Sequence, residues 1–469
     1  MYKKIVFLVT ILITVSLNTA LSKSPEDVWM EIYSGDKKVG HIHREISGSG
    51  ELTKIKEQTL LKLDLLGTET EMDIRSQYLL NKNKISSFIY SVSSSSIKLN
   101  LKGGISGNKL TIVDLGNNSK QEYILKHEYI VPSMLPDYIY GRGLTEGSSY
   151  ELFLFDPVNI YTGYDPAQLK ANIEVQGIET VKTKSGTYSA SRVSVNFLGA
   201  ENTLWITKNG TNVLEKFEPS LTAVISNKNE ALRNKNEAFD ITEKTSIASN
   251  IYIHKPREVT KMVVELKGIK DIEGLNVDDG NYQDLSGNLL TIRTPAVPND
   301  NSYFLPYQGK KFAEYLGATT LIQKDDPAIV RKAKKILNGE NNPVLAVKLI
   351  NDWTYSNIEK IPTVSIPSAV EVLSTMKGDC NEHAVLFAAL TRAAGIPVKV
   401  VLGVVYLEGR FYYHAWNEVY IGRWVPVDST FGQMPSDATH IKLIEGDISK
   451  SPDILKVVGK MKLTVVETN

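Results

Sequence analysis

The sequence is short of cysteine and of any excess charge. Its 469 residues contain a single cysteine, Cys380, which excludes an internal disulfide, a cysteine-rich zinc site and a cysteine-ligated iron–sulfur cluster. The 53 basic residues balance 53 acidic ones, so the chain has no global attraction to nucleic acid or to an anionic membrane. It shows no internal repeat and no calcium loop of the EF-hand type. An apolar content of 42% indicates a globular protein, and the length predicts about two to four domains.

The N-terminal residues 1–22 have the pattern of a secretory signal peptide. Lys3 and Lys4 form a positively charged start, an apolar run of about 13 residues follows, and Ala20-Leu21-Ser22 offers small residues for cleavage. The run is too short for a permanent transmembrane helix, and no cysteine follows it to carry a lipid. We therefore expect a periplasmic or secreted protein without a stable membrane span.

The rest of the chain predicts three parts. Residues 23–235 show short alternating segments separated by turn dipeptides such as Asn209-Gly210, which predicts a large antiparallel β domain. Residues 236–324 predict a small β module. Residues 325–469 predict an α+β domain, with three helices that begin at or near a proline. The elements expected there are helices at 326–337, 343–355, 367–376 and 380–394, and strands at 398–407, 411–420 and 423–427.

The single cysteine lies at the predicted start of the fourth helix. Asp379 and Glu382 have the spacing of a capping box, which places Asp379 at the N-cap and Cys380 at the first helical position. The helix dipole and the exposed N–H groups there favour a thiolate, whereas the charge of Asp379 opposes it. An isolated cysteine is more often a small buried apolar residue than a nucleophile, so the neighbouring residues must decide.

A histidine and an aspartate follow on two adjacent predicted strands. His414 lies early in one strand, and Asp428 ends the next. If a tight turn near Ile421-Gly422 joins them, the residue opposite His414 lies near position 429, and Asp428 lies within about one position of it. A carboxylate there would orient the imidazole and stabilise its protonated form. Cysteine, histidine and aspartate in this order indicate a thiol nucleophile with a base and an orienting residue.

These motifs resemble those of the transglutaminase-like superfamily, in its bacterial secreted branch. The resemblance covers about residues 325–445 and rests on the segments Gly378-Asp379-Cys380-x-Glu382-His383-Ala384, Ala394-Gly395-Ile396-Pro397, His414-Ala415-Trp416 and Trp424-Val425-Pro426-Val427-Asp428-Ser429-Thr430. It implies a papain-like core and acyl transfer through a thioester. It also implies Cys380 as nucleophile, His414 as general base and acid, and Asp428 as the orienting residue. His440, in the segment Ala438-Thr439-His440, resembles a usual tail of this branch and receives no role.

The oxyanion donors and the acceptor stay open at this point. The backbone N–H of Cys380 is one candidate donor. The side chains of Trp353 and Tyr355 are two others, although packing in the core is the favoured role for both. The implied substrate is a protein, a peptide or a cell-wall amide, the acceptor is water or an amine, and no cofactor is implied. His41, His43 and Glu45 share one strand face, where a solvated surface is favoured over a metal site, so no metal is expected.

Two alternatives compete with a thiol enzyme. The first is a catalytically idle scaffold in the cell envelope that uses the same fold to bind a peptide or a glycan. The second is a metal-binding envelope protein.

Overall fold

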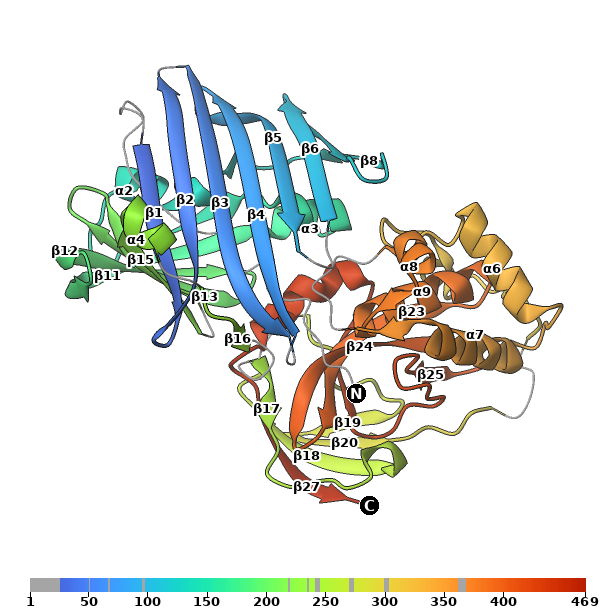
Figure 1. Ribbon diagram of the computed structural model, residues 1–469. Coiled ribbons are helices and arrows are strands. Elements are labelled where there is room, and N and C mark those ends of the chain that lie inside the picture. The colour runs from blue at the N-terminus through green and yellow to red at the C-terminus, as the bar shows by residue number, and fades with distance from the viewer. Residues whose placement is uncertain are drawn as a thin grey trace. The chain divides into compact units, whose positions relative to one another are not determined.

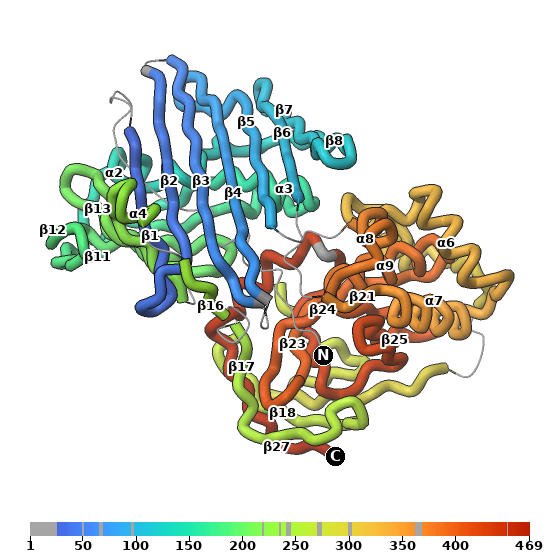
Figure 2. Tube along the Cα trace, viewed as in Figure 1, coloured from blue at the N-terminus to red at the C-terminus, as the bar shows by residue number. Residues whose placement is uncertain are grey.

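The fold was analysed in a computed structural model of the chain (Figures 1 and 2). It describes residues 26–49, 51–65, 68–94, 98–217, 220–233, 236–240, 245–269, 274–298, 303–361 and 368–469. The expected signal peptide lies outside these residues. In the part of the chain that is described, no helix has both the length and the apolar character that crossing a bilayer requires.

The chain divides into two compact units, with the boundary between Lys244 and Thr245. The sequence suggested boundaries at 235/236 and 324/325 instead. In the structure, strand β18 (Lys261–Lys267) pairs with the C-terminal strand β27 (Lys462–Thr468). Because these strands are about 200 residues apart in the sequence, their pairing ties the region read as a small β module to the C-terminal domain.

The N-terminal unit is built on one large sheet. The strand order is β8-β7-β6-β5-β4-β3-β2-β1-β15-β14-β13-β12-β11-β10-β9, and β16 pairs with β3 off this path. Figure 1 shows β1 to β6 side by side as a meander of long strands. Neighbours along the order pair antiparallel except β9 with β10, so the predicted large antiparallel domain is confirmed. The strands are β1 (Glu26–Ser34), β2 (Lys37–Ser49), β3 (Leu52–Leu65), β4 (Thr68–Asn81), β5 (Lys84–Ser93), β6 (Lys98–Ser106), β7 (Lys109–Asp114), β8 (Lys120–Ile124), β9 (Tyr129–Ile130), β10 (Ser149–Leu154), β11 (Lys170–Thr183), β12 (Gly186–Phe197), β13 (Ala200–Thr207), β14 (Asn212–Phe217), β15 (Leu221–Ser226) and β16 (Phe239–Asp240).

Side chains alternate between buried and exposed along these strands, as in β7, whose even-numbered residues are buried. Short helices follow some of the strands: α2 (Leu135–Arg142), α3 (Pro157–Thr162) and α4 (Lys228–Arg233). The interior also holds charge. Arg44 is 1% exposed, and its guanidinium lies 3.6 Å from the carboxylates of both Glu26 and Asp137. Such a group is retained in a core only when charged or polar partners surround it.

The C-terminal unit combines helices with three sheets. The five-stranded sheet has the order β17-β24-β23-β26 with β25 on β24, the four-stranded sheet has the order β19-β20-β18-β27, and β21 pairs with β22. The remaining strands are β17 (Ile247–Ala248), β19 (Gln283–Ser286), β20 (Leu289–Arg293), β21 (Glu359–Lys360), β22 (Lys377–Gly378), β23 (Val398–Leu407), β24 (Arg410–Tyr420), β25 (Trp424–Val427) and β26 (His440–Gly446).

Among the described residues of this unit, three α-helices gather around a fourth, α9. They are α6 (Pro327–Leu337), α7 (Pro343–Asn357), α8 (Ala369–Thr375) and α9 (Cys380–Ala393), with 3-10 turns η3 (Pro256–Glu258), η4 (Ala313–Leu316) and η5 (Ile448–Lys456). Helix α9 packs against β23 and β24 and contacts the three other helices (Figure 2). Pro327 and Pro343 each follow a capping residue at their helix start, as predicted. Pro367 lies outside the described residues.

Candidate active site

Cys380 is the first residue of α9, which begins with the predicted capping box. The Asp379 side chain accepts a hydrogen bond from the backbone N–H of Asn381, and the backbone N–H of Asp379 donates to Glu382 Oε2 at 2.9 Å. Gly378 precedes the cap with a φ of +153°, and a Cβ there would lie 2.3 Å from the Glu382 side chain. Only glycine therefore fits before the cap. The arrangement fixes Cys380 at the positive end of a helix dipole, where it is 4% exposed.

The environment of the cap weakens the negative charge of Asp379 beside the thiol. Burial, together with the neighbouring charge of Glu382, raises the pKa of Asp379 well above its ordinary value. A raised pKa favours the protonated carboxyl group, and this reduces the opposition of Asp379 to a Cys380 thiolate.

His414 and Asp428 are hydrogen-bonded to each other in the interior. His414 Nε2–H donates to Asp428 Oδ2 at 2.7 Å, and the two side chains are 2% and 0% exposed. The other carboxylate oxygen, Oδ1, accepts from the backbone N–H groups of Thr430 at 2.7 Å and Phe431 at 3.2 Å. Burial by itself raises the pKa of Asp428, but the charge of His414 and its hydrogen bonds outweigh burial and hold this pKa well below the ordinary value. Asp428 is thus an oriented anion.

The strand register explains why this pair meets. Asn417 pairs with Val427 across β24 and β25, so the same register places position 430 opposite His414 and Asp428 opposite Trp416. The sequence estimate of position 429 was one residue short. The difference of one position in register matters, because side chains alternate between the two faces of a sheet. In the observed register Asp428 lies on the same face as His414 and Trp416.

His440 is a second histidine on the same carboxylate. It begins β26, and its Nε2–H donates to Asp428 Oδ2 at 3.0 Å. Its Nδ1–H donates to the backbone carbonyl oxygen of Asp437 at 3.1 Å. Sequence reasoning assigned this residue no role. The available signal was a third histidine at the start of a strand, 12 residues after Asp428.

Gly403 allows the strands of the two histidines to pack closely. It lies on β23, between β24 and β26, and pairs with His414 on one side. A Cβ at Gly403 would lie 2.0 Å from the carbonyl oxygen of Ile441 and 2.8 Å from the Trp416 ring. The missing side chain leaves the space that the Trp416 ring fills between His414 and His440, with ring centroids 5.9 Å and 5.3 Å away.

The helix of Cys380 is bound to the strand of His414. Asn417 of β24 is fully buried, and its Nδ2 donates to the carbonyl oxygen of Ala384 in the second turn of α9 at 3.1 Å. The same nitrogen donates to the carbonyl oxygen of Lys399 on β23 at 3.3 Å. This side chain joins helix and sheet near the helix start, because buried amides of this kind are fixed by their hydrogen bonds.

The two candidate oxyanion side chains lie in different surroundings. Trp353 is half-buried on α7, with Lys332 Nζ of α6 4.7 Å above its ring. Tyr355 is 42% exposed, and its ring lies against Gly432, where a Cβ would come within 2.9 Å of it. Tyr355 is therefore next to the turn that follows Asp428, and Trp353 packs against a helix.

Lys360 is a cation near this site that sequence reasoning missed. Its ammonium lies 4.0 Å above the Tyr355 ring and donates to the Tyr355 carbonyl oxygen at 3.0 Å. The strand pairing places it beside Gly378, two residues before Cys380. Burial lowers the pKa of Lys360, and the charge of Asp428 partly offsets this. A two-residue parallel pairing leaves no pattern in a sequence.

Two groups of residues contain side chains of the kinds that bind metal ions. One ligand atom each from His414, Asp428 and His440 lies within 4.8 Å of the others, but a metal ion among them would have to break the His414–Asp428 hydrogen bond. Hydrogen bonding accounts for this cluster without an ion.

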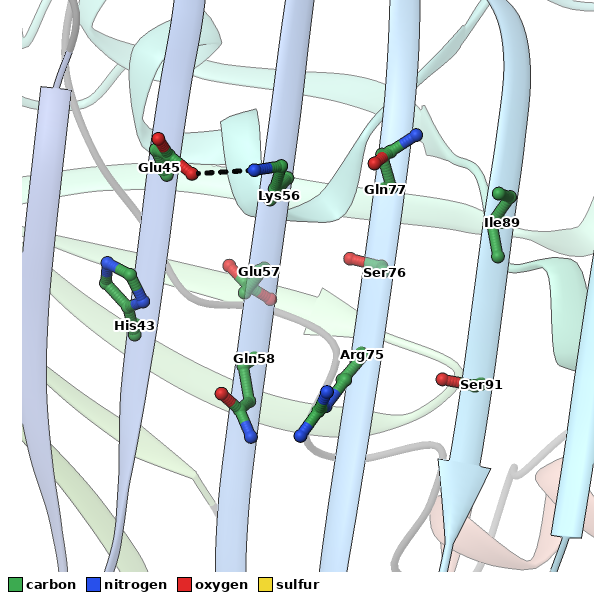
Figure 3. Close-up of a pocket in the computed structure, with 10 residues that line it drawn as sticks. All are labelled: His43, Glu45, Lys56, Glu57, Gln58, Arg75, Ser76, Gln77, Ile89 and Ser91. Atoms are coloured by element: carbon green, nitrogen blue, oxygen red, sulfur yellow. Dashed lines mark hydrogen bonds and ion pairs between the residues drawn. The ribbon is translucent and has the colours of Figure 1, made fainter.

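The second group is on the N-terminal sheet. His43 and Glu45 lie on one face of β2, and they line a shallow cavity of about 360 Å³ over β2 to β5 (Figure 3). His43 Nε2 lies 2.7 Å from Asp27 Oδ1, and Glu45 accepts from Lys56 at 3.1 Å. His41, two residues earlier on β2, is 8% exposed. The groups thus pair across strands, as on an ordinary polar sheet face.

Comparison with known families matches part of the C-terminal unit. The family model described as transglutaminase-like superfamily matches residues 330–429, a range that contains Cys380, His414 and Asp428. An uncharacterized protein of Haemophilus influenzae is 32% identical over 161 residues, 28% of this chain and 42% of that protein. Kyphoscoliosis peptidase of Mus musculus is 39% identical over 83 residues, 15% of this chain and 12% of that protein. The chain spans less than half the length of these curated relatives.

Solved structures show weaker likeness. A proposed cysteine protease from Cytophaga hutchinsonii has a TM-score of 0.30 and 17% identity, covering 45% of this chain and 87% of that chain. A β-barrel-like protein from Brucella abortus, a domain of unknown function, has a TM-score of 0.35 and 10% identity, covering 44% of this chain and 97% of that chain. From the family model we conclude that this protein carries a transglutaminase-like domain at residues 330–429.

Proposed function

We propose that the C-terminal unit is an extracytoplasmic thiol enzyme that attacks an amide carbonyl through Cys380, His414 and Asp428. The observation that carries the proposal is the His414–Asp428 hydrogen bond of 2.7 Å between two side chains that are almost fully buried. A buried carboxylate in this position holds the imidazole in one orientation and stabilises its protonated form, and a general base needs both. Cys380, at the capped start of a helix that packs against the strand of His414, is the nucleophile that we assign to this pair.

The hydrogen bond also decides which histidine nitrogen exchanges the proton. Because His414 Nε2 is engaged by Asp428, the proton of the Cys380 thiol goes to Nδ1. The thiolate then attacks the carbonyl carbon, the C–N bond breaks, and the amine leaves with the proton from Nδ1. The acyl group remains as a thioester on Cys380 until water or an amine attacks it. The backbone N–H of Cys380 is the proposed first oxyanion donor.

For the second oxyanion donor we propose Tyr355 ahead of Trp353. Tyr355 lies beside the turn after Asp428, and the residue is 42% exposed. Trp353 is occupied by its contact with Lys332. An oxyanion donor must reach the position where negative charge develops, and an exposed side chain beside the turn after Asp428 favours Tyr355.

The proposed acyl donor is a protein or peptide amide, or a cell-wall amide. Support for a peptide comes from the peptidase name of the kyphoscoliosis relatives, which share 39% and 40% identity with short segments of this chain. Water is the proposed acceptor, and transfer to an amine is the second possibility, since both reactions use the same thioester. The proposed location is periplasmic or extracellular, and the signal-like residues 1–22 support it.

The test is to trap the acyl-enzyme. The protein is mixed with a peptide library, quenched in acid and digested, and the peptide that contains Cys380 is analysed by mass spectrometry. We expect an added acyl mass on Cys380 that hydroxylamine removes, as expected of a thioester. The His414→Ala variant should not accumulate it, and Cys380→Ala is the control for adducts elsewhere. If no library yields an adduct and the thiol reacts like an ordinary one, the idle scaffold replaces this proposal.

A further inference from the structure

The hydrogen bonds of His440 fix its protonation state. Its Nδ1 lies 3.1 Å from the Asp437 carbonyl oxygen, and its Nε2 lies 3.0 Å from Asp428 Oδ2. A carbonyl oxygen and an ionised carboxylate only accept hydrogen bonds, so both ring nitrogens must carry a proton. His440 is therefore an imidazolium cation. Burial alone lowers its pKa, but the Asp437 and Asp428 carboxylates outweigh burial and raise it.

A second carboxylate and a guanidinium anchor this cation from the other side. His440 Nδ1 lies 3.5 Å from Asp437 Oδ1, and Arg257 Nη1 donates to Asp437 Oδ2 at 2.8 Å. Thr439 donates to Asp437 Oδ1 from its backbone N–H and from its hydroxyl group. Asp437 thus has several fixed partners, and Arg257 is also bound to the Tyr406 carbonyl oxygen. Positive and negative groups thus alternate along a row that runs from Arg257 through Asp437, His440 and Asp428 to His414.

The inner part of this row, from Asp437 through His440 to Asp428, is closed from water. The side chains of His440, Asp437 and Asp428 are 1%, 2% and 0% exposed, so their attraction is little screened. The groups that face His440 come from several elements. They are Asp428 after β25, Asp437 before β26, His414 of β24 at a ring distance of 5.6 Å, the uncharged rings of Trp416 and Phe431, and Arg257 of η3 through Asp437.

We infer that His440 is a positioning residue, a cation that fixes the Asp428 carboxylate for His414. The inference rests on the proposed thiol function and extends it, because the three proposed catalytic residues lie within 330–429 and His440 lies beyond that match. Asp428 Oδ2 accepts hydrogen bonds from two N–H donors, so without His440 one hydrogen bond fewer holds the carboxylate against rotation. His440 also offsets part of the Asp428 charge.

Loss of the cation has two separable consequences. The carboxylate becomes less well fixed, so His414 is less well oriented and thiol reactivity falls. The removal of one positive charge from a dry site also raises the pKa of each remaining group, including the thiol and the imidazole. The whole pH profile of Cys380 reactivity therefore moves to higher pH. A residue that only packs would produce neither effect in a folded variant.

The experiment measures alkylation of Cys380 by iodoacetamide from pH 4 to pH 10, in the full chain. His440→Phe keeps a ring against Trp416 and Phe431 but loses both N–H donors. His440→Gln keeps an N–H donor for Asp428 and loses the charge. His254→Gln is the matched control, because His254 is exposed. A thermal melt confirms that each variant is folded.

We expect Cys380 in the His440→Phe variant to be alkylated about tenfold more slowly than in wild type, each at its pH optimum. In the His440→Gln variant the rate should recover to within about threefold of wild type. Both profiles should move to higher pH. A His440→Phe profile equal to that of wild type overturns the inference, and so does a folded His440→Gln as slow as His440→Phe. If His440→Phe does not fold, the His440→Gln profile decides alone: a shift supports the inference, and coincidence with wild type overturns it. If Cys380 of the His414→Ala variant is alkylated at the wild-type rate, the proposed function itself is rejected.

Discussion

Replacement of Asp428 by asparagine removes one charge without a change of shape, and the hydrogen bonds around it determine the outcome. Oδ1 accepts from the backbone N–H groups of Thr430 and Phe431, and an amide NH₂ group cannot accept those bonds. The asparagine oxygen must therefore remain at that position, and the NH₂ group must point at Nε2 of His414 and His440. Each histidine must then present an unprotonated Nε2, so His414 carries its proton on Nδ1 and has no lone pair for the thiol proton.

The expected loss of activity is large for this reason. The variant should fix the wrong tautomer of His414 as well as remove the charge that stabilises its imidazolium form. For triads of this type the loss is on the order of 10³-fold or more, which corresponds to about 4 kcal/mol of transition-state stabilisation. The folded state should be weakened as well, because hydrogen bonds to a charged group contribute about 1.5–3 kcal/mol each.

The assay is the second-order rate of Cys380 alkylation by iodoacetamide at pH 7, followed by intact mass. The protein has one cysteine, so the mass of the whole chain reports on this residue. Asp279→Asn is the control, because it removes from the same unit a buried carboxylate, which pairs with Lys442 rather than with a histidine. A folded Asp428→Asn variant that reacts within about threefold of wild type would refute the tautomer argument.

Three further predictions concern the packing and the ionisation around the site. Gly403→Ala places a Cβ 2.0 Å from the Ile441 carbonyl oxygen, so urea unfolding should show a loss of about 2–3 kcal/mol; an unchanged midpoint would contradict this packing. Lys442→Met leaves the buried Glu418 without its 2.8 Å ion pair and should cost about 3–5 kcal/mol, and a melting temperature equal to that of wild type would contradict it. Burial raises the pKa of Asp437, but the charge of His440 and further partners lower it to about 2. Its stabilisation is therefore present above about pH 4 and lost as the pH falls towards 2, so Asp437→Asn should flatten the acid side of a stability–pH curve; an equally steep curve would contradict this.

Local sequence signals were sufficient for the large N-terminal sheet and for the starts of three helices of the C-terminal unit. Turn dipeptides and alternation predicted the large antiparallel sheet, and a proline after a capping residue predicted the starts of α6 and α7. The capping box at Asp379 fixed the first residue of α9. These signals act over a few residues, so one sequence contains them. The pairing of β18 with β27 could not be predicted, because it joins segments about 200 residues apart and depends on how the intervening chain folds.

The candidate site could be predicted only in part, for the same reason. A hairpin after His414 brings Asp428 close by chain connectivity alone, although its register was estimated one residue short. His440 was missed because β26 reaches the site through β23, with a register shift between Leu402 and Gly403. Lys360 was missed because two short parallel strands carry no pattern. Such contacts depend on the order of strands in the sheet, which local propensity does not determine.

The most direct test of the central claim compares the thiol of Cys380 in the folded and in the unfolded protein. Alkylation by iodoacetamide is measured at pH 6, once in buffer and once in concentrated urea. An activated thiolate predicts faster reaction in the folded protein, although the side chain is 4% exposed there, because an ordinary thiol with a pKa of about 8.5 is almost fully protonated at pH 6. Slower reaction in the folded protein, as for a buried apolar cysteine, would contradict the account.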